Sequence, residues 1–249
     1  RVPLEYFEVR ESLERELLVN SFYQSQPTQI LKYKHRYPPA IHSILAANDI
    51  PADFKYLAVA ESGLRINISP KGAAGFWQII ESTAKQYGIK VTNEIDQRYD
   101  LEKSTEVACK YFKNAYKKFG NWTMAAASYN LGIGGTAKQA GYQEITSFYD
   151  LYTNSETSRY VFRILAFKLI LENPEQYGYI GIEPYPTIKQ KVIVVDTAIS
   201  DLSAFARSQG SNYKMLKSLN PWLRDKFLPN PDSTSYKITL IEESERKIK

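Results

Sequence analysis

Residues 53–63 read Asp-Phe-Lys-Tyr-Leu-Ala-Val-Ala-Glu-Ser-Gly, and this stretch decides how the chain is interpreted. Its spacing places Phe54, Leu57 and Glu61 at positions i, i+3 and i+7, which share one face of an α-helix. Gly63 is a natural helix end, so Glu61 falls in the last helical turn. The sequence therefore predicts a helix that carries a carboxyl group on its apolar side.

Two physical effects disfavour the ionised form of Glu61. Burial removes water from the carboxylate, and the end of the helix presents the negative pole of its dipole. We therefore expect its pKa to lie above the usual value of about 4.3. A carboxyl group that stays protonated near neutral pH suits general-acid cleavage of a glycosidic bond, as in lysozyme. The alternative is a helix-end glutamate paired with Arg65 or Lys55.

A second motif is the glycine-rich segment 69–78, Ser-Pro-Lys-Gly-Ala-Ala-Gly-Phe-Trp-Gln. Gly75 lets the backbone approach a ligand closely. Phe76 and Trp77 offer ring faces that can stack on sugar rings, and Gln78 can hydrogen-bond an N-acetyl or hydroxyl group. The alternative for the two aromatic residues is packing in the core.

A third motif, Ala-Ala-Ala-Ser-Tyr-Asn at residues 125–130, is a small-residue helix that ends in a Tyr-Asn pair before a glycine-rich stop. Alanines allow close helix packing, and Tyr129 and Asn130 can point into a cleft. Asn130 near a helix end is otherwise an ordinary cap.

Together these motifs resemble the lytic transglycosylases of the goose-type lysozyme superfamily, and most of all the membrane-bound lytic murein transglycosylase D branch. Four ordered elements carry the resemblance over roughly residues 4–171. They are Glu61-Ser62, Gly75-Phe76-Trp77-Gln78, Ser128-Tyr129-Asn130 and Tyr160-Val161. Phe76-Trp77 stands where Leu-Met is common in the family, and Ser128 where alanine is usual, which affects fine specificity and not the reaction class.

The resemblance implies an enzyme that cuts the N-acetylmuramic acid–N-acetylglucosamine β-1,4 bond of peptidoglycan without water and leaves 1,6-anhydromuramic ends. Glu61 acts first as acid and then as base. No second catalytic carboxylate is evident, because Glu81 and Glu156 do not fall at the matching position. The implied substrate-binding residues are Ser62, Gly75, Phe76, Trp77, Gln78, Tyr129, Asn130 and Tyr160.

Apolar residues recur at helical spacing from Leu4 to Leu171, which indicates a mainly α fold, by resemblance a lysozyme-like helical catalytic domain. Residues 1–176 are predicted to form this domain, including N-terminal helices. Residues 177–186, with two glycines and two prolines among tyrosines, are linker-like or wrap over a surface.

Residues 187–249 are predicted to form a small α+β domain in the order strand, helix, helix, strand. This order, with Asn220-Pro221-Trp222-Leu223, resembles a LysM glycan-binding module. The segment is expected either to bind N-acetylglucosamine stretches or to buttress the catalytic domain. In the first case its deletion would weaken binding to intact wall more than turnover of soluble fragments, and in the second case both equally.

Composition excludes several other classes of function. The net charge of +5 comes from interspersed residues with no basic stripe, which argues against a nucleic-acid partner. Cys109 is the only cysteine, so no internal disulfide can form, and with His35 and His42 it offers too few soft ligands for zinc. No metal or organic cofactor is expected.

The expected partner, peptidoglycan, implies a periplasmic or cell-envelope location. No apolar run long enough to span a membrane occurs, and any export signal or lipid anchor would precede Arg1. Two alternatives to a transglycosylase remain: a lysozyme- or chitinase-type hydrolase of a similar glycan, and a non-catalytic peptidoglycan-binding protein. The sequence does not decide between endolytic and exolytic action, the need for stem peptides, or the oligomeric state.

Overall fold

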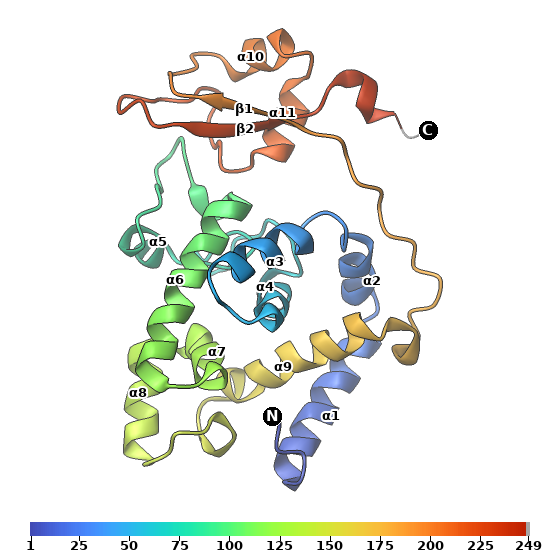
Figure 1. Cartoon of the computed structure of the whole chain (residues 1–249), viewed down its shortest axis with the longest axis vertical. Coiled ribbons are helices and arrows are strands. Elements are labelled where there is room, and N and C mark those ends of the chain that lie inside the picture. The colour runs from blue at the N-terminus through green and yellow to red at the C-terminus, as the bar shows by residue number, and fades with distance from the viewer. Residues whose placement is uncertain (248–249) are drawn as a thin grey trace. The chain divides into compact units, whose positions relative to one another are not determined.

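The computed structural model describes residues 1–247, and these are mainly helical (Figure 1). The predicted fold class, helical with a small strand-helix-helix-strand part near the C-terminus, is confirmed. The elements are α1 (Phe7–Phe22), α2 (Ser25–Lys32), α3 (Pro38–Ala47), α4 (Lys55–Ser62), α5 (Glu81–Gln86), α6 (Leu101–Phe119), α7 (Trp122–Leu131), α8 (Ile133–Tyr142), α9 (Ser155–Glu172), β1 (Lys191–Val195), α10 (Leu202–Ser208), α11 (Tyr213–Leu219) and β2 (Tyr236–Leu240).

The chain packs as two compact units that are each discontinuous in sequence. The first contains residues 1–65 and 105–185, and the second contains residues 66–104 and 186–249. The segment with the glycine-rich motif is thus grouped with the C-terminal segment. The division into domains at residues 177–186 remains a prediction.

In the first unit α9 is the central helix, with α1, α2, α4 and α7 packed against it (Figure 1). Its apolar residues, among them Val161, Phe167 and Ile170, are buried on several sides, as expected for a helix surrounded by others. Asn154 caps its start by accepting a hydrogen bond from the Thr157 amide at 2.9 Å.

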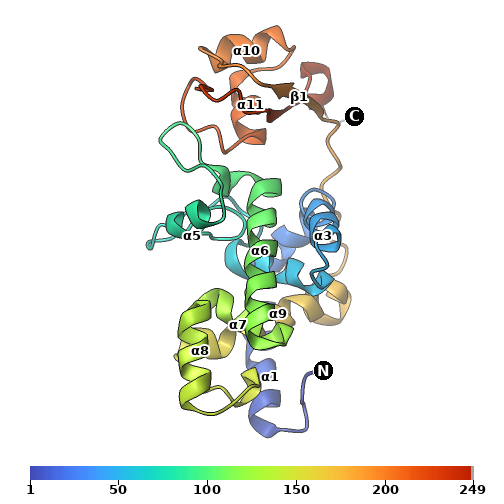
Figure 2. The ribbon, with the colours of Figure 1, turned by 60° about the vertical axis from the view of Figure 1, so that its left-hand side comes forward.

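The sequence indicated a glycine-rich stop after Asn130 and missed α8. Asn121 caps α7 by accepting from the Met124 amide at 2.8 Å, and Gly132 ends α7 at φ 83°, where the stop was expected. Gly134 and Gly135, however, lie inside α8 and do not simply close α7. α8 lies beside α7 (Figure 2), and the backbone of Gly135 comes so close to Leu131 that an added Cβ would be 3.2 Å from its Cγ. Close packing outweighs the low helix propensity of glycine here.

In the second unit β1 and β2 form an antiparallel pair, with Lys191 opposite Leu240 and Val195 opposite Tyr236. Helices α10 and α11 pack with each other, and α11 packs on β2. The core draws on both segments of the unit. Its buried members are Ala74, Ile95, Tyr99, Leu202, Ala206, Leu216, Trp222, Leu223, Leu228, Tyr236, Ile238 and Leu240.

Residues 177–185 wrap over the first unit. Tyr179 is buried against Leu31 and Ile170, and its hydroxyl donates to the Ser21 carbonyl at 2.6 Å. The Tyr185 amide donates to the carbonyl of Lys32 at 2.8 Å. The composition of residues 177–186 allowed either a linker or a segment that wraps over a surface, and the structure shows the second for residues 177–185.

Candidate active site

Glu61 lies in the last turn of α4, where the sequence placed it. Gly63 ends this helix in the left-handed conformation, at φ 61°, and its amide donates to the Val59 carbonyl at 2.8 Å. The buried Ser62 hydroxyl donates to the Ala58 carbonyl and accepts from the Leu64 amide, both at 3.1 Å. Ser62 therefore holds the shape of the helix end beside Glu61.

Glu61 as a residue is half-buried, and the environment of its carboxyl group favours the protonated form. Burial raises the pKa of Glu61 to about 7, and the nearby Glu156 carboxylate acts in the same direction. The hydrogen bond from Tyr160 and the positive charge of Arg163 oppose the rise. A carboxyl group with this pKa can both give and take a proton near neutral pH.

Tyr160 supplies the direct partner of this acid. Its hydroxyl donates a hydrogen bond to Oε1 of Glu61, and its side chain is 2% exposed. Burial, followed by the charge of Glu61, raises the pKa of the phenol well above its usual value, so it remains a donor at any physiological pH. The structure thus brings together the two residues that the first and fourth motifs singled out.

Asn130 is held in a defined orientation in the same unit. Its Nδ2 donates to Oε1 of Glu156 at 3.0 Å, and its Oδ1 accepts from the buried Thr157 hydroxyl at 2.7 Å. The two partners come from the first turn of α9. These bonds identify which end of the Asn130 amide is the NH2 donor and which is the oxygen acceptor. The side chain therefore has one defined orientation.

Tyr129 lies in an aromatic cluster in the first unit. Its ring centroid is 5.1 Å from those of Tyr111 and Phe112, and it is half-buried. It also contributes electrostatically to the raised pKa of Tyr160, which places the two phenols near each other. Glu61, Tyr129, Asn130 and Tyr160 therefore belong to one constellation.

The glycine-rich motif lies in the second unit, where Gly75 is required by sterics. It has φ 78°, and an added Cβ would lie 1.9 Å from the Arg98 carbonyl oxygen. Gln78 also has a positive φ, 47°, and its Nε2 donates to the carbonyls of Asn67 at 3.1 Å and Gly75 at 2.9 Å. These bonds fold the Gln78 side chain back on its own turn.

Phe76 and Trp77 are 3% and 0% exposed. Neither ring presents a face to solvent, which agrees with core packing, the alternative left open for them. Their contact with a sugar, like the substrate contacts of Gly75 and Gln78, stays a prediction.

Several residues that the motifs do not mark support these groups. Arg98, 6% exposed, makes a two-pronged ion pair with Asp96, with contacts from 2.7 to 3.2 Å, and its Nη1 donates to the carbonyls of Gly72 and Ile79. In the first unit Glu156 and Arg163 flank Glu61 electrostatically. The i, i+4 spacing of Glu156 and Tyr160 on one helix could have indicated that Glu156 lies near the site. Nothing in the sequence marks Arg98.

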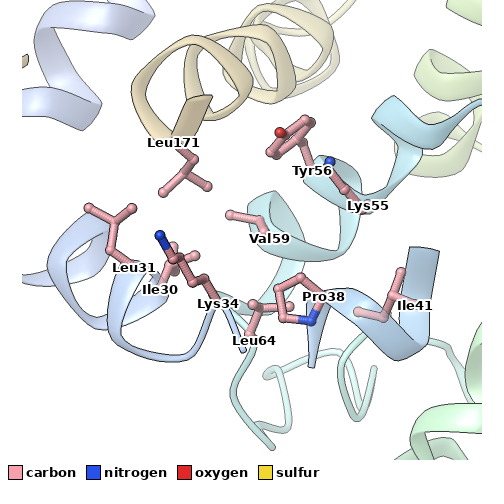
Figure 3. A pocket seen from close by; sticks show the side chains of 10 residues that line it. All are labelled: Ile30, Leu31, Lys34, Pro38, Ile41, Lys55, Tyr56, Val59, Leu64 and Leu171. Atoms are coloured by element: carbon pink, nitrogen blue, oxygen red, sulfur yellow. The ribbon is translucent and has the colours of Figure 1, made fainter. Parts of the chain in front are cut away.

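An apolar cavity of about 150 Å³ lies between α2, α3, α4 and the end of α9 (Figure 3). Val59 and Tyr56 of α4 line it, while Glu61, two positions beyond Val59, does not. Figure 3 shows the amine of Lys34 pointing into this space. The cavity is separate from the candidate acid, so it is not the proposed cleft.

Among residues 1–247, no group of three or more His, Cys, Asp or Glu is arranged to hold a metal ion. Within the same residues, none of the helices combines the length and apolarity needed to cross a membrane.

Residues 40–151 match the family described as Transglycosylase SLT domain, and residues 191–244 match the Soluble lytic transglycosylase C-terminal LysM-like domain. The chain is 35% identical over 136 residues to membrane-bound lytic murein transglycosylase D of Escherichia coli (strain K12), which covers 52% of this chain and 30% of that protein. It is 31% identical over 88 residues to a putative tributyltin chloride resistance protein of Alteromonas sp. (strain M-1), covering 34% and 42%. The chain therefore matches less than half the length of either relative.

Two solved structures are also similar. The 70 kDa soluble lytic transglycosylase of Escherichia coli has a TM-score of 0.47 at 26% identity, covering 56% of this chain and 24% of that one. An inactive mutant of the lytic transglycosylase Slt of Pseudomonas aeruginosa has a TM-score of 0.47 at 18% identity, covering 58% and 26%.

Proposed function

We infer that this chain, in which residues 40–151 match the transglycosylase SLT domain and residues 191–244 match the C-terminal LysM-like domain of soluble lytic transglycosylases, is a peptidoglycan lytic transglycosylase. It cuts the β-1,4 bond between N-acetylmuramic acid and N-acetylglucosamine and leaves a 1,6-anhydromuramic end. The observation that carries this proposal is the Glu61 carboxyl group, whose pKa of about 7 and contact with the buried Tyr160 suit one group to act as acid and base.

In the first step protonated Glu61 gives its proton to the bridging oxygen while the bond from that oxygen to C1 of the muramic residue breaks. N-Acetylglucosamine leaves with that proton on its 4-hydroxyl. The substrate's own 2-acetamido group stabilises the positive charge that develops at C1. A second catalytic carboxylate is therefore unnecessary, unlike in ordinary retaining or inverting glycosidases.

In the second step the Glu61 carboxylate takes the proton of the muramic C6 hydroxyl, and the C6 oxygen forms a bond to C1. The carboxyl group returns to its starting state, and no water is consumed. Tyr160 donates to Glu61 throughout and holds the carboxylate in place. Ser62 orients Glu61 or contacts the substrate, Gln78 and Asn130 hold the sugar near the cut, and Tyr129 and Tyr160 line the cleft.

Because the acid form of Glu61 is needed first, turnover falls as the pH rises through about 7. The substrate also places the reaction in the cell envelope, where peptidoglycan lies.

The deciding experiment is mass spectrometry of peptidoglycan digested by the wild type and by Glu61→Gln. We expect 1,6-anhydromuramic products from the wild type and none from the variant, since Gln keeps the shape but gives no proton. The matched control is Glu81→Gln, because Glu81 is an exposed glutamate on α5 that pairs with Lys85. Wild-type products from Glu61→Gln would exclude the proposed role.

The same digest separates the two alternatives. Glu156, the carboxylate next to Glu61, is the group that a hydrolase would use to activate water, and reducing muramic ends that disappear in Glu156→Gln would identify a hydrolase. Absence of products with retained wall binding would identify a non-catalytic binding protein.

A further inference from the structure

The C-terminal LysM-like segment and residues 66–104 share backbone pairing. Ile95 and Leu223 form an antiparallel β-bridge, and both residues are almost fully buried. On either side of it the Asp96 amide donates to the Trp222 carbonyl at 2.9 Å, and the Arg224 amide donates to the Glu94 carbonyl at 2.8 Å. Backbone pairing of this kind fixes register, so the two segments form one folded body.

Side chains extend this seam in both directions. The Arg224 guanidinium lies over the Tyr99 ring, 4.5 Å from its centroid. Lys90 Nζ reaches Asp232 and the Tyr236 hydroxyl, each at 3.2 Å, from the other side of the unit. Apolar residues of both segments share a single core, to which residues 66–104 contribute Ala74, Ile95 and Tyr99.

From the seam a continuous set of contacts leads to the glycine-rich turn. Asp96, whose amide bonds to Trp222, also holds the guanidinium of Arg98 through its carboxylate at 2.7 to 3.2 Å. Arg98 then donates to the carbonyl of Gly72 at 2.8 Å, and its own carbonyl packs directly over Gly75. The position of the turn is thus defined by residues that the C-terminal segment holds.

We propose that the LysM-like segment buttresses the turn Gly75–Gln78 and, through the Asp96–Arg98 pair, positions it for substrate. This role rests on the proposed function, because it takes the turn to contact the glycan. Of the two roles expected for the segment, glycan binding and buttressing, this is the second. It makes Leu223, Asp96 and Arg98 positioning residues. None of them is placed in contact with substrate.

The first test does not depend on activity and follows amide hydrogen exchange in the full chain. The reporters are the amides of Ala74 and Ile79, which bond to each other's carbonyls at 3.1 Å. In Leu223→Ala, which removes packing at the seam, we expect both to exchange at least about tenfold faster. Arg224→Ala removes the side-chain contacts with the Tyr99 ring and the Pro221 carbonyl and gives a smaller change in the same direction. The control Lys214→Ala, an exposed lysine of α11, leaves both amides at the wild-type rate.

The second test measures kcat and KM on a soluble glycan fragment. Leu223→Ala is expected to lower kcat/KM on the order of tenfold, because a displaced turn misplaces the sugar. The Glu61 carboxyl titration, followed by carbon-13 NMR, stays at its wild-type midpoint, so the effect does not come from the acid itself.

Two results would overturn the proposal. One is wild-type exchange at Ala74 and Ile79 in Leu223→Ala. The other is loss of binding to insoluble peptidoglycan with kcat/KM and turn protection intact, which would assign the segment to glycan binding alone. A wild type that makes no anhydro products while exchange still responds would reject the proposed reaction and keep the buttress.

Discussion

The protonation of Glu61 links activity to stability at the scale of a single residue. Its pKa is about 7 in the folded chain against an ordinary value of 4.5. Between these two values the folded state binds more protons than the unfolded state, so this group makes the protein less stable as the pH rises. Above about pH 7 the difference is complete and amounts to about 3 kcal/mol.

Glu61→Gln should therefore be more stable than the wild type at pH 8, by up to about 3 kcal/mol, and equal to it near pH 4. Gln keeps the oxygen that accepts from Tyr160 and carries no charge to desolvate. Urea unfolding at the two pH values measures the difference. Glu81→Gln is the control, and an equal stability difference at both pH values would show that the raised pKa is wrong.

Gly75 offers a second prediction at this scale. Gly75→Ala combines a strained φ of 78° with a Cβ 1.9 Å from the Arg98 carbonyl oxygen, and we expect a loss of about 3 kcal/mol. Gly72→Ala is the matched control: its φ is 75°, but a Cβ there meets nothing within 4 Å, so it should lose only about 1 kcal/mol. Urea unfolding followed by tryptophan fluorescence compares the two, and equal losses would refute the steric account.

The residues that sequence alone could predict are those whose local pattern carries the chemistry. The position of Glu61, two residues before a glycine, predicted both its place in α4 and the direction of its pKa shift. The contact of Tyr160 with it came only from the family resemblance, since the two residues lie 99 positions apart. The burial of Trp77 could not be predicted, because aromatic residues suit a core and a sugar-binding face equally well.

At the scale of elements, a buried carboxylate joins α1 to α9. Glu16 is 1% exposed, and its oxygens lie 2.5 Å from Nε of Arg159 and 3.9 Å from Nε of Arg163. These two arginines flank Tyr160 on α9. The helix that holds the partner of the acid is therefore tied to α1 by charge as well as by apolar packing.

Glu16→Gln should lower the free energy of unfolding by about 2 kcal/mol, because it leaves Arg15, Arg159 and Arg163 without their shared counter-ion. The uncompensated charge of Arg163 should also lower the pKa of Glu61 and move the alkaline limb of the pH–rate profile to lower pH. Thermal unfolding and the pH–rate profile measure the two effects. Glu14→Gln, on the exposed side of α1, should change neither.

An unchanged alkaline limb in Glu16→Gln would show that Glu16 is purely structural. Sequence could predict the helices that this pair joins but not the pairing, because α1 carries four glutamates of which only Glu16 is buried. Helix α8 shows a second reason why sequence prediction fails, because its local residues disfavour the structure that forms. Its glycines predict a break, and only packing against α7 explains the helix.

At the scale of the whole molecule, segments that follow one another in the sequence do not all pack into the same unit. Residues 66–104 leave the first unit in sequence and join a core completed by residues 186–249. The sequence predicted the strand-helix-helix-strand order correctly, yet its composition gave no sign of this union. The bridging pair, Ile95 and Leu223, consists of ordinary apolar residues with no complementary pattern.

A chain that ends at Tyr185 should lose turnover of soluble fragments as severely as it loses binding to intact wall. Without the C-terminal segment, Ile95 and Tyr99 lose their apolar partners, while the contacts of Glu61 with Tyr160 remain within the first unit. Fragment turnover and wall-binding assays on the same preparation measure both losses. A shortened chain that turns over fragments at the wild-type rate would contradict this expectation.

The discontinuous second unit also has a consequence for how the protein folds as it is made. Lys90 bonds to Asp232, a residue 142 positions later, so the chain must be synthesised past Asp232 before this contact of the second unit can form. Closing so distant a contact is slow compared with forming the local helices of the first unit. A chain that stops before this point would keep the contact of Glu61 with Tyr160 but lack the C-terminal partners of the segment that carries the glycine-rich turn.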